Sequence, residues 1–311
     1  RTFGPLGRRY ANAMAEVEAY RWAGVEWPSN LFGKWKKRVA LISEEYEFRG
    51  IGSVSKATEG TEITILARRS VRTSLLAGAL TAAFEQLTEC THRMRWEDDR
   101  DDGARITLEA TDRPFFKPEE TITSDEGQGE RPESELIHDA GITPDGIMTL
   151  EQVPSIIFPS QFFDALVMVL ETLQEEGSPA LTDSRCEWDL PLPDGVDETT
   201  RDRVWTMIAT AISEGLEEHI DELLVAEAEH WRLAINHRLA RSSLCSAVNV
   251  RQFGEHGEIE LEFASIIHPA ILSGVLLALW QVAEHRIPRI KWQREEGVWI
   301  ASIEPWRAIA T

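Results

Sequence analysis

The side chains in this sequence that could do chemistry are a few histidines, cysteines and clustered carboxylates. Glu227 and His230 are spaced so that a helix would place both on one face, and His237 follows two turns later. A di-iron centre in a helical bundle needs two such helices and two further glutamates. No second Glu-x-x-His pair occurs on a comparable long helix pattern. We therefore interpret these residues as surface groups and expect no bound metal.

A cysteine close to a histidine could form a reactive thiolate, and Cys90 and His92 lie near the end of a predicted helix. Residues so close in sequence point in different directions, however. The second copy of this stretch, described below, has Arg286 and Pro288 at the same positions. We predict a buried cysteine and a histidine at a helix end.

Acidic residues fill the stretch 97–102, except for Arg100. A calcium loop alternates its ligands around a glycine at the sharp turn and ends with a bidentate glutamate. Here Gly103 follows the acids instead of interrupting them. The pattern favours a solvated hairpin tip.

Other motifs of catalysis and cofactor binding are missing from the sequence. It contains no GxxxxGK[ST] loop for phosphates and no GxSxG elbow for acyl transfer. We predict no cofactor, and we favour a protein that is not an enzyme. An enzyme whose site is assembled between repeated units stays open as an alternative.

The charge of the chain limits its partners. Asp and Glu outnumber Lys and Arg by 53 to 32, giving a formal net charge of −21. Such a field repels nucleic-acid phosphates and favours basic or amphipathic protein partners. No apolar run reaches the roughly 18 residues that a membrane span needs. The three cysteines are isolated from one another in sequence, which favours a reducing, cytoplasmic compartment.

One basic cluster interrupts this acidity, with Lys34, Lys36, Lys37 and Arg38 around Trp35. Tryptophan among cations could stack on nucleic-acid bases. So few cations are a small footprint for a chain of this charge, and we expect them to line the exposed side of a helix. A contact with an acidic partner, or a local contact with nucleic acid, stays open.

The chain repeats itself. The stretch from Trp35 to Trp96 aligns without a gap onto the stretch from Trp231 to Trp292. A partial third copy lies between them, where residues 155–159 match residues 265–269. Self-similarity of this kind shows how a fold is assembled.

Each copy has the same predicted elements. Strands with period-two alternation form a hairpin, a helix with one continuous apolar stripe follows, and a second hairpin closes the unit. The fold class is therefore α+β, with three tandem hairpin-helix-hairpin units in which a helix covers an antiparallel sheet. We predict the following organisation: an N-terminal helical segment (1–30), repeat unit 1 (31–114), an acidic linker (115–135), a partial repeat unit 2 (136–196), a connecting helix (197–241) and repeat unit 3 (242–311).

The run from Trp188 to Pro193, followed by an amphipathic helix from Thr199, resembles a feature of known families. A Leu-Pro-Leu strand end leading into a helix, together with the order of elements, is similar to the type III secretion chaperone fold, including the YbjN-type proteins. The resemblance implies an acidic, non-catalytic protein that binds other polypeptides. It carries over no site residues, and those families usually hold a single domain.

We therefore expect a chaperone-like or adaptor module that binds a polypeptide partner. Tryptophans are favoured at binding hot spots, so the strand tryptophans and the basic cluster are the candidate binding residues. They are Trp35, Lys36, Lys37, Trp96, Trp188, Trp292 and Trp299. An acidic mimic of nucleic acid that regulates a basic protein is a further alternative. Self-association through sheet edges also stays open.

Overall fold

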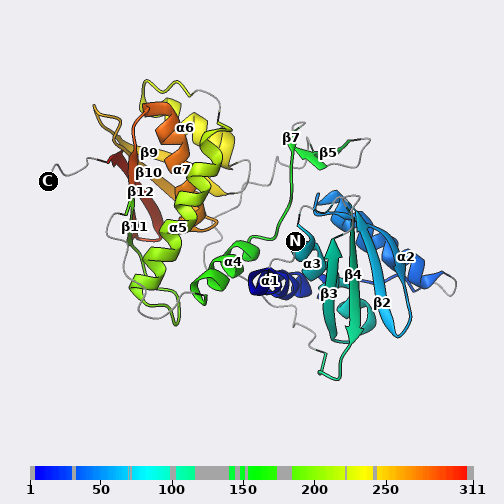
Figure 1. The fold of residues 1–311 in the computed structure, drawn as a ribbon. Coiled ribbons are helices and arrows are strands. Elements are labelled where there is room, and N and C mark those ends of the chain that lie inside the picture. The colour runs from blue at the N-terminus through cyan, green and yellow to red at the C-terminus, as the bar shows by residue number, and fades with distance from the viewer. Residues whose placement is uncertain are drawn as a thin grey trace. The chain divides into compact units, whose positions relative to one another are not determined.

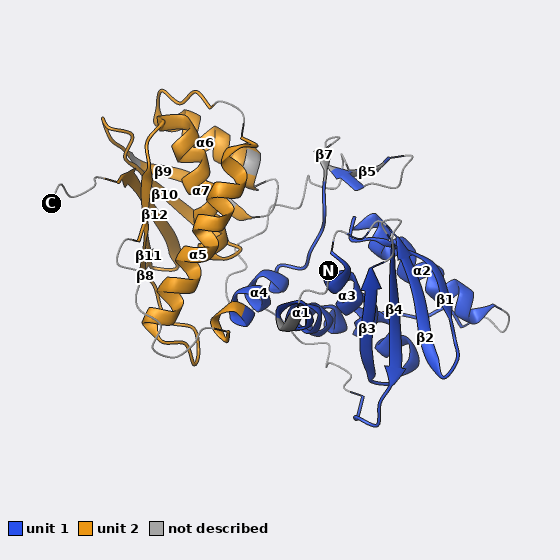
Figure 2. Cartoon of the chain, in the orientation of Figure 1, with its two compact units in different colours: residues 1–123, 137–169 blue, residues 124–136, 170–311 orange. Residues whose placement is uncertain are grey.

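The structure is a computed structural model, and the chain divides into two compact units (Figure 2). One unit comprises residues 1–123 and 137–169, and the other comprises residues 124–136 and 170–311. The fold is mixed α and β with antiparallel hairpins, which confirms the α+β class (Figure 1). The structure describes residues 4–29, 33–68, 70, 72–98, 103–115, 140–143, 148–150, 153–173, 184–220, 223–240 and 244–306.

The first unit contains two helices, a hairpin, a third helix and a second hairpin. These are α1 (Gly4–Ala23), α2 (Lys34–Phe48), β1 (Ser53–Thr58), β2 (Glu62–Arg68), α3 (Thr73–Thr88), β3 (His92–Asp98) and β4 (Gly103–Ala110). The four strands form an antiparallel sheet in the order β1-β2-β4-β3. The second hairpin therefore lies beside the first with β4 next to β2, and β3 forms one edge of the sheet.

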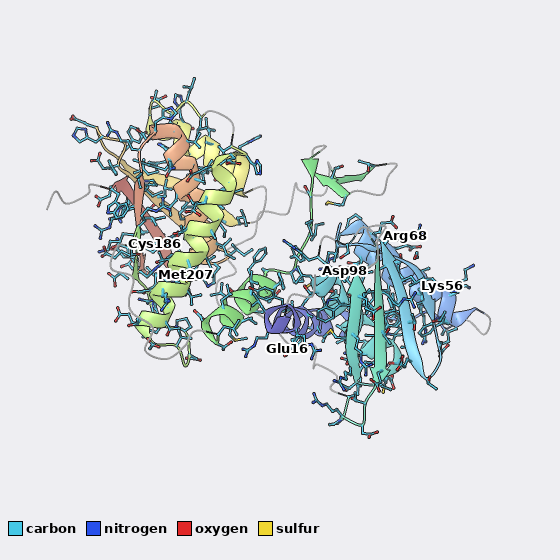
Figure 3. All side chains as sticks on the ribbon, viewed as in Figure 1. Glu16, Lys56, Arg68, Asp98, Cys186 and Met207 are labelled. Carbon is cyan, nitrogen blue, oxygen red and sulfur yellow. The ribbon has the colours of Figure 1, made fainter. Side chains whose placement is uncertain are left out.

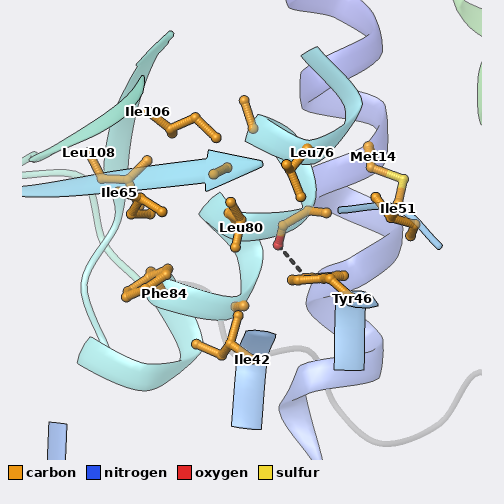
Figure 4. Packing of buried hydrophobic residues seen from close by; sticks show 14 of the residues in the cluster. Met14, Ile42, Tyr46, Ile51, Ile65, Leu76, Leu80, Phe84, Ile106 and Leu108 are labelled. Atoms are coloured by element: carbon orange, nitrogen blue, oxygen red, sulfur yellow. Dashed lines mark hydrogen bonds between the residues drawn. The ribbon is translucent and has the colours of Figure 1, made fainter. Parts of the chain in front are cut away.

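The core of this unit follows from the periodicities in the sequence. Ile65 in β2 and Ile106 in β4 face α3, which presents Leu80 and Phe84 (Figure 4). All four side chains are fully buried. The hydroxyl of Tyr46 in α2 donates to the carbonyl of Ala79, at 2.6 Å, and so satisfies its polar group inside the core.

The first unit continues into three short strands and a helix. These are β5 (Ala140–Ile142), β6 (Met148–Leu150), β7 (Val153–Pro154) and α4 (Gln161–Glu171). Beyond β7 the chain runs past the end of α2, where the amide of Ile157 donates to the carbonyl of Arg49. The guanidinium of Arg49 is buried with the carboxylate of Glu18 and makes two hydrogen bonds to it, of 2.9 and 2.6 Å.

The second unit repeats the same order of elements after an additional strand. Its elements are β8 (Cys186–Asp189), α5 (Glu198–Glu217), α6 (Ala228–Ile235), the π-helical segment η2 (Asn236–Ala240), β9 (Cys245–Phe253), β10 (Ile259–Ile266), α7 (Pro269–Glu284), β11 (Pro288–Glu295) and β12 (Val298–Pro305). The sheet order is β8-β11-β12-β10-β9. Without β8, this is the order of the first sheet. The added strand pairs with β11 in parallel, whereas the other pairs are antiparallel.

The repeated unit is larger than the sequence predicted. The stretch 197–241, predicted as one connecting helix, contains α5, α6 and η2, and the described residues between Glu217 and Ala228 are not helical. Helix α5 packs on α7 as α1 packs on α3. The two helical stretches outside the predicted units therefore belong to them. An apolar stripe shows that a helix packs against something, but it does not show against what.

The prediction of three tandem units is not confirmed. Two hairpin-helix-hairpin sheets are present in the described parts of the chain. The strand of the middle copy that contains Trp188 joins the second sheet as β8 instead of forming its own hairpin. The acidic linker predicted at 115–135 lies, apart from its first residue, outside the described residues.

Candidate functional site

The residues considered for metal binding are placed as follows. The exposed side chains of Glu227 and His230 lie 3.5 Å apart, and His237 lies in η2. Within the residues that the structure describes, no three His, Cys, Asp or Glu side chains are grouped so that they could hold a metal ion. The acidic stretch 97–102 lies mostly outside the described residues, and its Asp98 accepts a hydrogen bond of 2.6 Å from Thr73.

Two of the three cysteines, Cys186 and Cys245, are buried, and Cys90 is half-buried. Burial raises the pKa of Cys186 and of Cys245 to about 12, so both stay protonated at neutral pH. The thiol of Cys90 lies 3.7 Å from the carbonyl oxygen of Thr91, its acceptor. Burial lowers the pKa of His92, and its Nδ1 is buried with no hydrogen-bond partner among the described residues.

Two of the predicted binding tryptophans lie in the core. Trp292 is fully buried and Trp188 is 5% exposed. Their ring nitrogens donate to Ser273 at 2.6 Å and to Thr206 at 3.3 Å. These bonds place both rings on the sheet face that is covered by the helices. Alternate residues of a strand point to the same side, so the neighbouring strand residues face away from the helices. They cannot serve as anchors for a partner in this structure, contrary to the prediction.

The other candidate residues are at least partly exposed. Trp35 is half-buried and donates from Nε1 to the carbonyl of Ala57, while Lys36 and Lys37 are exposed as predicted for a solvated helix face. Trp299 is half-buried under the guanidinium of Arg294. The remaining tryptophan, Trp96, is half-buried at the edge of the first sheet.

The edges of the two main sheets differ in whether side chains occupy their backbone groups. At β1, the hydroxyl of Ser43 in α2 accepts from the amide of Val54 at 2.9 Å and donates to its carbonyl at 3.2 Å. At β9, the side chain of Asn236 makes the corresponding pair of bonds to Val248, at 3.1 and 3.4 Å. At each of these two edges, one polar residue of a helical segment occupies the outward amide and carbonyl of one strand residue.

The edge formed by β8 is closed from two sides. The hydroxyl of Ser184 accepts from the amide of Cys186 at 3.1 Å and donates to its carbonyl at 2.7 Å. The buried guanidinium of Arg201 donates to the carbonyls of Trp188 and Leu190, at 3.0 and 2.6 Å. Unpaired strand edges are sites for pairing with another chain, and natural proteins usually block them.

At the fourth edge, β3, a side chain occupies an outward amide only at the first residue, within the described structure. The amide of Thr111 donates to the carbonyl of Thr91 just before this strand, which sets the alternation of its bonds with β4. The amides of Met94 and Trp96 therefore point away from β4. The outward amide of His92 is taken by the carboxylate of Glu85, at 2.6 Å. We call the backbone groups of Met94 and Trp96, together with the side chains of Arg93 and Arg95, the β3 edge.

The strands β3 and β11 occupy the same place in the two units, and β3 is the more exposed at each matched position up to Glu97. Met94 and Trp96 are half-buried, whereas their counterparts Ile290 and Trp292 are fully buried. The difference follows from β8, which lies against β11 and has no described counterpart beside β3. In Figure 3, Asp98 marks the end of β3 and Cys186 marks the start of β8.

The charges of this edge are positive in a chain that is acidic overall. The side chains of Arg93 and Arg95 are exposed on the sheet face opposite α3, and Arg95 forms an exposed ion pair of 2.8 Å with Glu109. The β3 edge thus combines backbone donors and acceptors that have no partner in the described part of the chain, partly exposed apolar surface and cations. It contains no nucleophile. Chemically, it is suited to pairing with an extended polypeptide.

The comparisons give no relative. The sequence matches no protein-family model, no curated protein and no solved structure. Among the described residues, no helix has the length and apolar character needed to cross a bilayer.

Sequence reasoning included Trp96 among the candidates but missed the edge around it. The edge depends on the strand order, because β3 is followed along the chain by its only described neighbour, β4. One signal was present in the alignment of the copies. Arg93 and Arg95 match the basic pair Arg289 and Lys291, although both pairs lie in an acidic chain.

Proposed function

We propose that this chain is a non-catalytic polypeptide-binding module, of a chaperone-like or adaptor kind, that pairs an extended segment of a partner with the β3 edge. One observation carries the proposal. Side chains or an added strand occupy outward backbone groups of Val54 in β1, Val248 in β9, Cys186 in β8 and Ile290 in β11, while the outward amides of Met94 and Trp96 have no partner among the described residues. The resemblance to type III secretion chaperones implies the same class of function.

The partly exposed apolar side chains of Met94 and Trp96 support the proposal that this edge binds a partner. Covering Met94 and Trp96 would give this unit the burial that Ile290 and Trp292 already have. Burial of apolar surface adds affinity, and strand pairing adds direction and register. The absence of a catalytic group from the β3 edge supports a binding role over the assembled enzyme site.

A proline substitution tests this proposal directly. Proline at position 94 removes the outward amide and is tolerated where an edge amide faces solvent. A displayed library of random peptides is selected for binding to the unmodified full chain. The affinities of the selected peptides are then measured for the unmodified chain and for the Met94→Pro variant. We expect Met94→Pro to weaken binding by about tenfold or more, since a backbone hydrogen bond is lost and the ring blocks close pairing.

The control is Met94→Leu, which changes the side chain but keeps the amide. It should bind the selected peptides within about twofold of the unmodified chain, as volume-conserving apolar changes are well tolerated. Circular dichroism checks that both variants remain folded. Selected peptides that bind Met94→Pro as tightly as the unmodified chain would contradict the proposed function.

A further inference from the structure

We propose that the partner segment lies parallel to β3 and carries a carboxylate that sits against Arg93 and Arg95, with apolar residues on either side of it. This inference rests on the proposed function and adds the direction and the chemistry of the partner. It comes from a comparison within the chain, because the second unit shows the corresponding edge already occupied.

The occupied edge is the pairing of β8 with β11. Cys186 lies opposite Ile290, Glu187 opposite Lys291 and Trp188 opposite Trp292, with the two strands parallel. The amide of Ile290 donates to the carbonyl of Arg185 at 2.8 Å. The outward amide of Ile290, which corresponds to that of Met94, is therefore already hydrogen-bonded in the second unit.

Opposite charges meet at the central residue of β8, Glu187. The carboxylate of Glu187 contacts Lys291 Nζ at 3.0 Å and accepts a hydrogen bond from Arg289. The hydrogen bond from Lys291 is the largest of the causes that hold the pKa of Glu187 below its ordinary value. Glu187 is thus the acidic residue of an occupied edge, held between two cations.

The same cation positions exist at β3 and are not filled in the same way. Arg93 and Arg95 align with Arg289 and Lys291. Arg95 is paired with Glu109 of the adjacent strand, while Arg93 forms no ion pair with any other described residue. A carboxylate arriving on the outer side of β3 would therefore meet Arg93 and would share Arg95 with Glu109.

The positions next to the carboxylate point to the other sheet face. In β8 these are Cys186 and Trp188, which are 6% and 5% exposed and cover the edge of the core. At β3, the surface they would cover is that of Met94 and Trp96. The partner pattern is therefore apolar, acidic, apolar. Both β8 residues are used within their own unit, so we assign the β3 edge to a strand of a different polypeptide and not to a second copy.

The test uses a synthetic peptide with the sequence of residues 184–190, in which Cys186→Val prevents oxidation. Binding to the full chain is measured by fluorescence anisotropy, alongside a peptide that also carries Glu187→Lys. We expect the charge-reversed peptide to bind about tenfold more weakly, because two attractive contacts become repulsive. The Arg93→Glu/Arg95→Glu chain should reverse this preference. Equal affinities of both peptides for both chains would overturn the acidic preference.

Direction is read with a photoreactive group at one end of the peptide and mass spectrometry of the crosslinked chain. Parallel pairing places the N-terminal end near His92 and the C-terminal end near Asp98. The reverse placement, or crosslinks confined to β11, would overturn the inference. In either case the library affinities for Met94→Pro still decide the proposed function independently. Sedimentation of the chain alone provides a last check, because self-association abolished by Met94→Pro would assign the edge to a second copy and overturn the choice of partner.

Discussion

Gly78 and Gly274 hold the same position in the two units, each at the crossing of a central helix with the first helix of its unit. A Cβ on Gly78 would lie 2.0 Å from the carbonyl oxygen of Ala11, and a Cβ on Gly274 would lie 2.7 Å from that of Ala209. The central helices also both end in a left-handed residue, Glu89 at φ 53° and His285 at φ 52°. The duplication is therefore three-dimensional, which justifies comparing β3 with β11.

These glycines give a first prediction. Alanine normally stabilises a helix relative to glycine by up to about 1 kcal/mol. At the helix crossing the added methyl would meet backbone, so Gly78→Ala and Gly274→Ala should each lower the free energy of unfolding by about 1–3 kcal/mol. Urea denaturation of the full chain measures the change. Gly215→Ala is the control, since its added Cβ would meet no described atom within 4 Å beyond its chain neighbours and the backbone of its own helix, and it should be neutral or stabilising.

Arg201 gives a second prediction, about the closed edge of β8. Replacing it with methionine keeps an extended side chain but leaves the carbonyls of Trp188 and Leu190 without their donor. We expect a loss of about 1–3 kcal/mol in the free energy of unfolding, because those groups lose their hydrogen bonds. We also expect concentration-dependent association in sedimentation experiments, because an edge is opened. An Arg201→Met chain that is as stable and as monodisperse as its parent would show that Arg201 does not close the edge.

His268 gives a third prediction, about acid stability. Its ring is half-buried at the start of α7, accepts a hydrogen bond from the amide of Ala270 and packs edge-on against Trp205. Burial lowers its pKa from 6.5 to about 4. The unfolded chain therefore binds this proton first as the pH falls, and stability is lost between pH 6.5 and about 4. The contribution lost is at most about 3 kcal/mol.

The comparison variant is His268→Asn, which keeps a helix-capping side chain without a titrating group. The difference in free energy of unfolding between the two chains should change across this pH range and level off above it. Equilibrium denaturation at a series of pH values measures that difference. A difference that is independent of pH would show that His268 does not titrate as described.

The sequence was a good guide to local structure and a poor guide to edges. The alternation of Ile63, Ile65 and Ala67 predicted β2, and the apolar stripe through Leu80 predicted α3, because burial imposes these periods directly. The sequence could not predict which sheet the strand that contains Trp188 joins, because its partner strand β11 lies far along the chain. The burial of Trp292 and the partial exposure of Trp96 depend on that pairing. The sequence alignment, in which both positions are tryptophan, therefore wrongly suggested equal roles for them.

The most direct test of the account is hydrogen–deuterium exchange at the amides of Met94 and Trp96. In the chain alone these two amides should exchange rapidly, while the matched amide of Ile290, which is bonded to β8, should be protected. Adding a selected polypeptide at saturating concentration should protect the amides of Met94 and Trp96 and leave that of Ile290 unchanged. Protection that appears elsewhere on the chain, with Met94 and Trp96 still exchanging rapidly in the complex, would contradict strand pairing at the β3 edge.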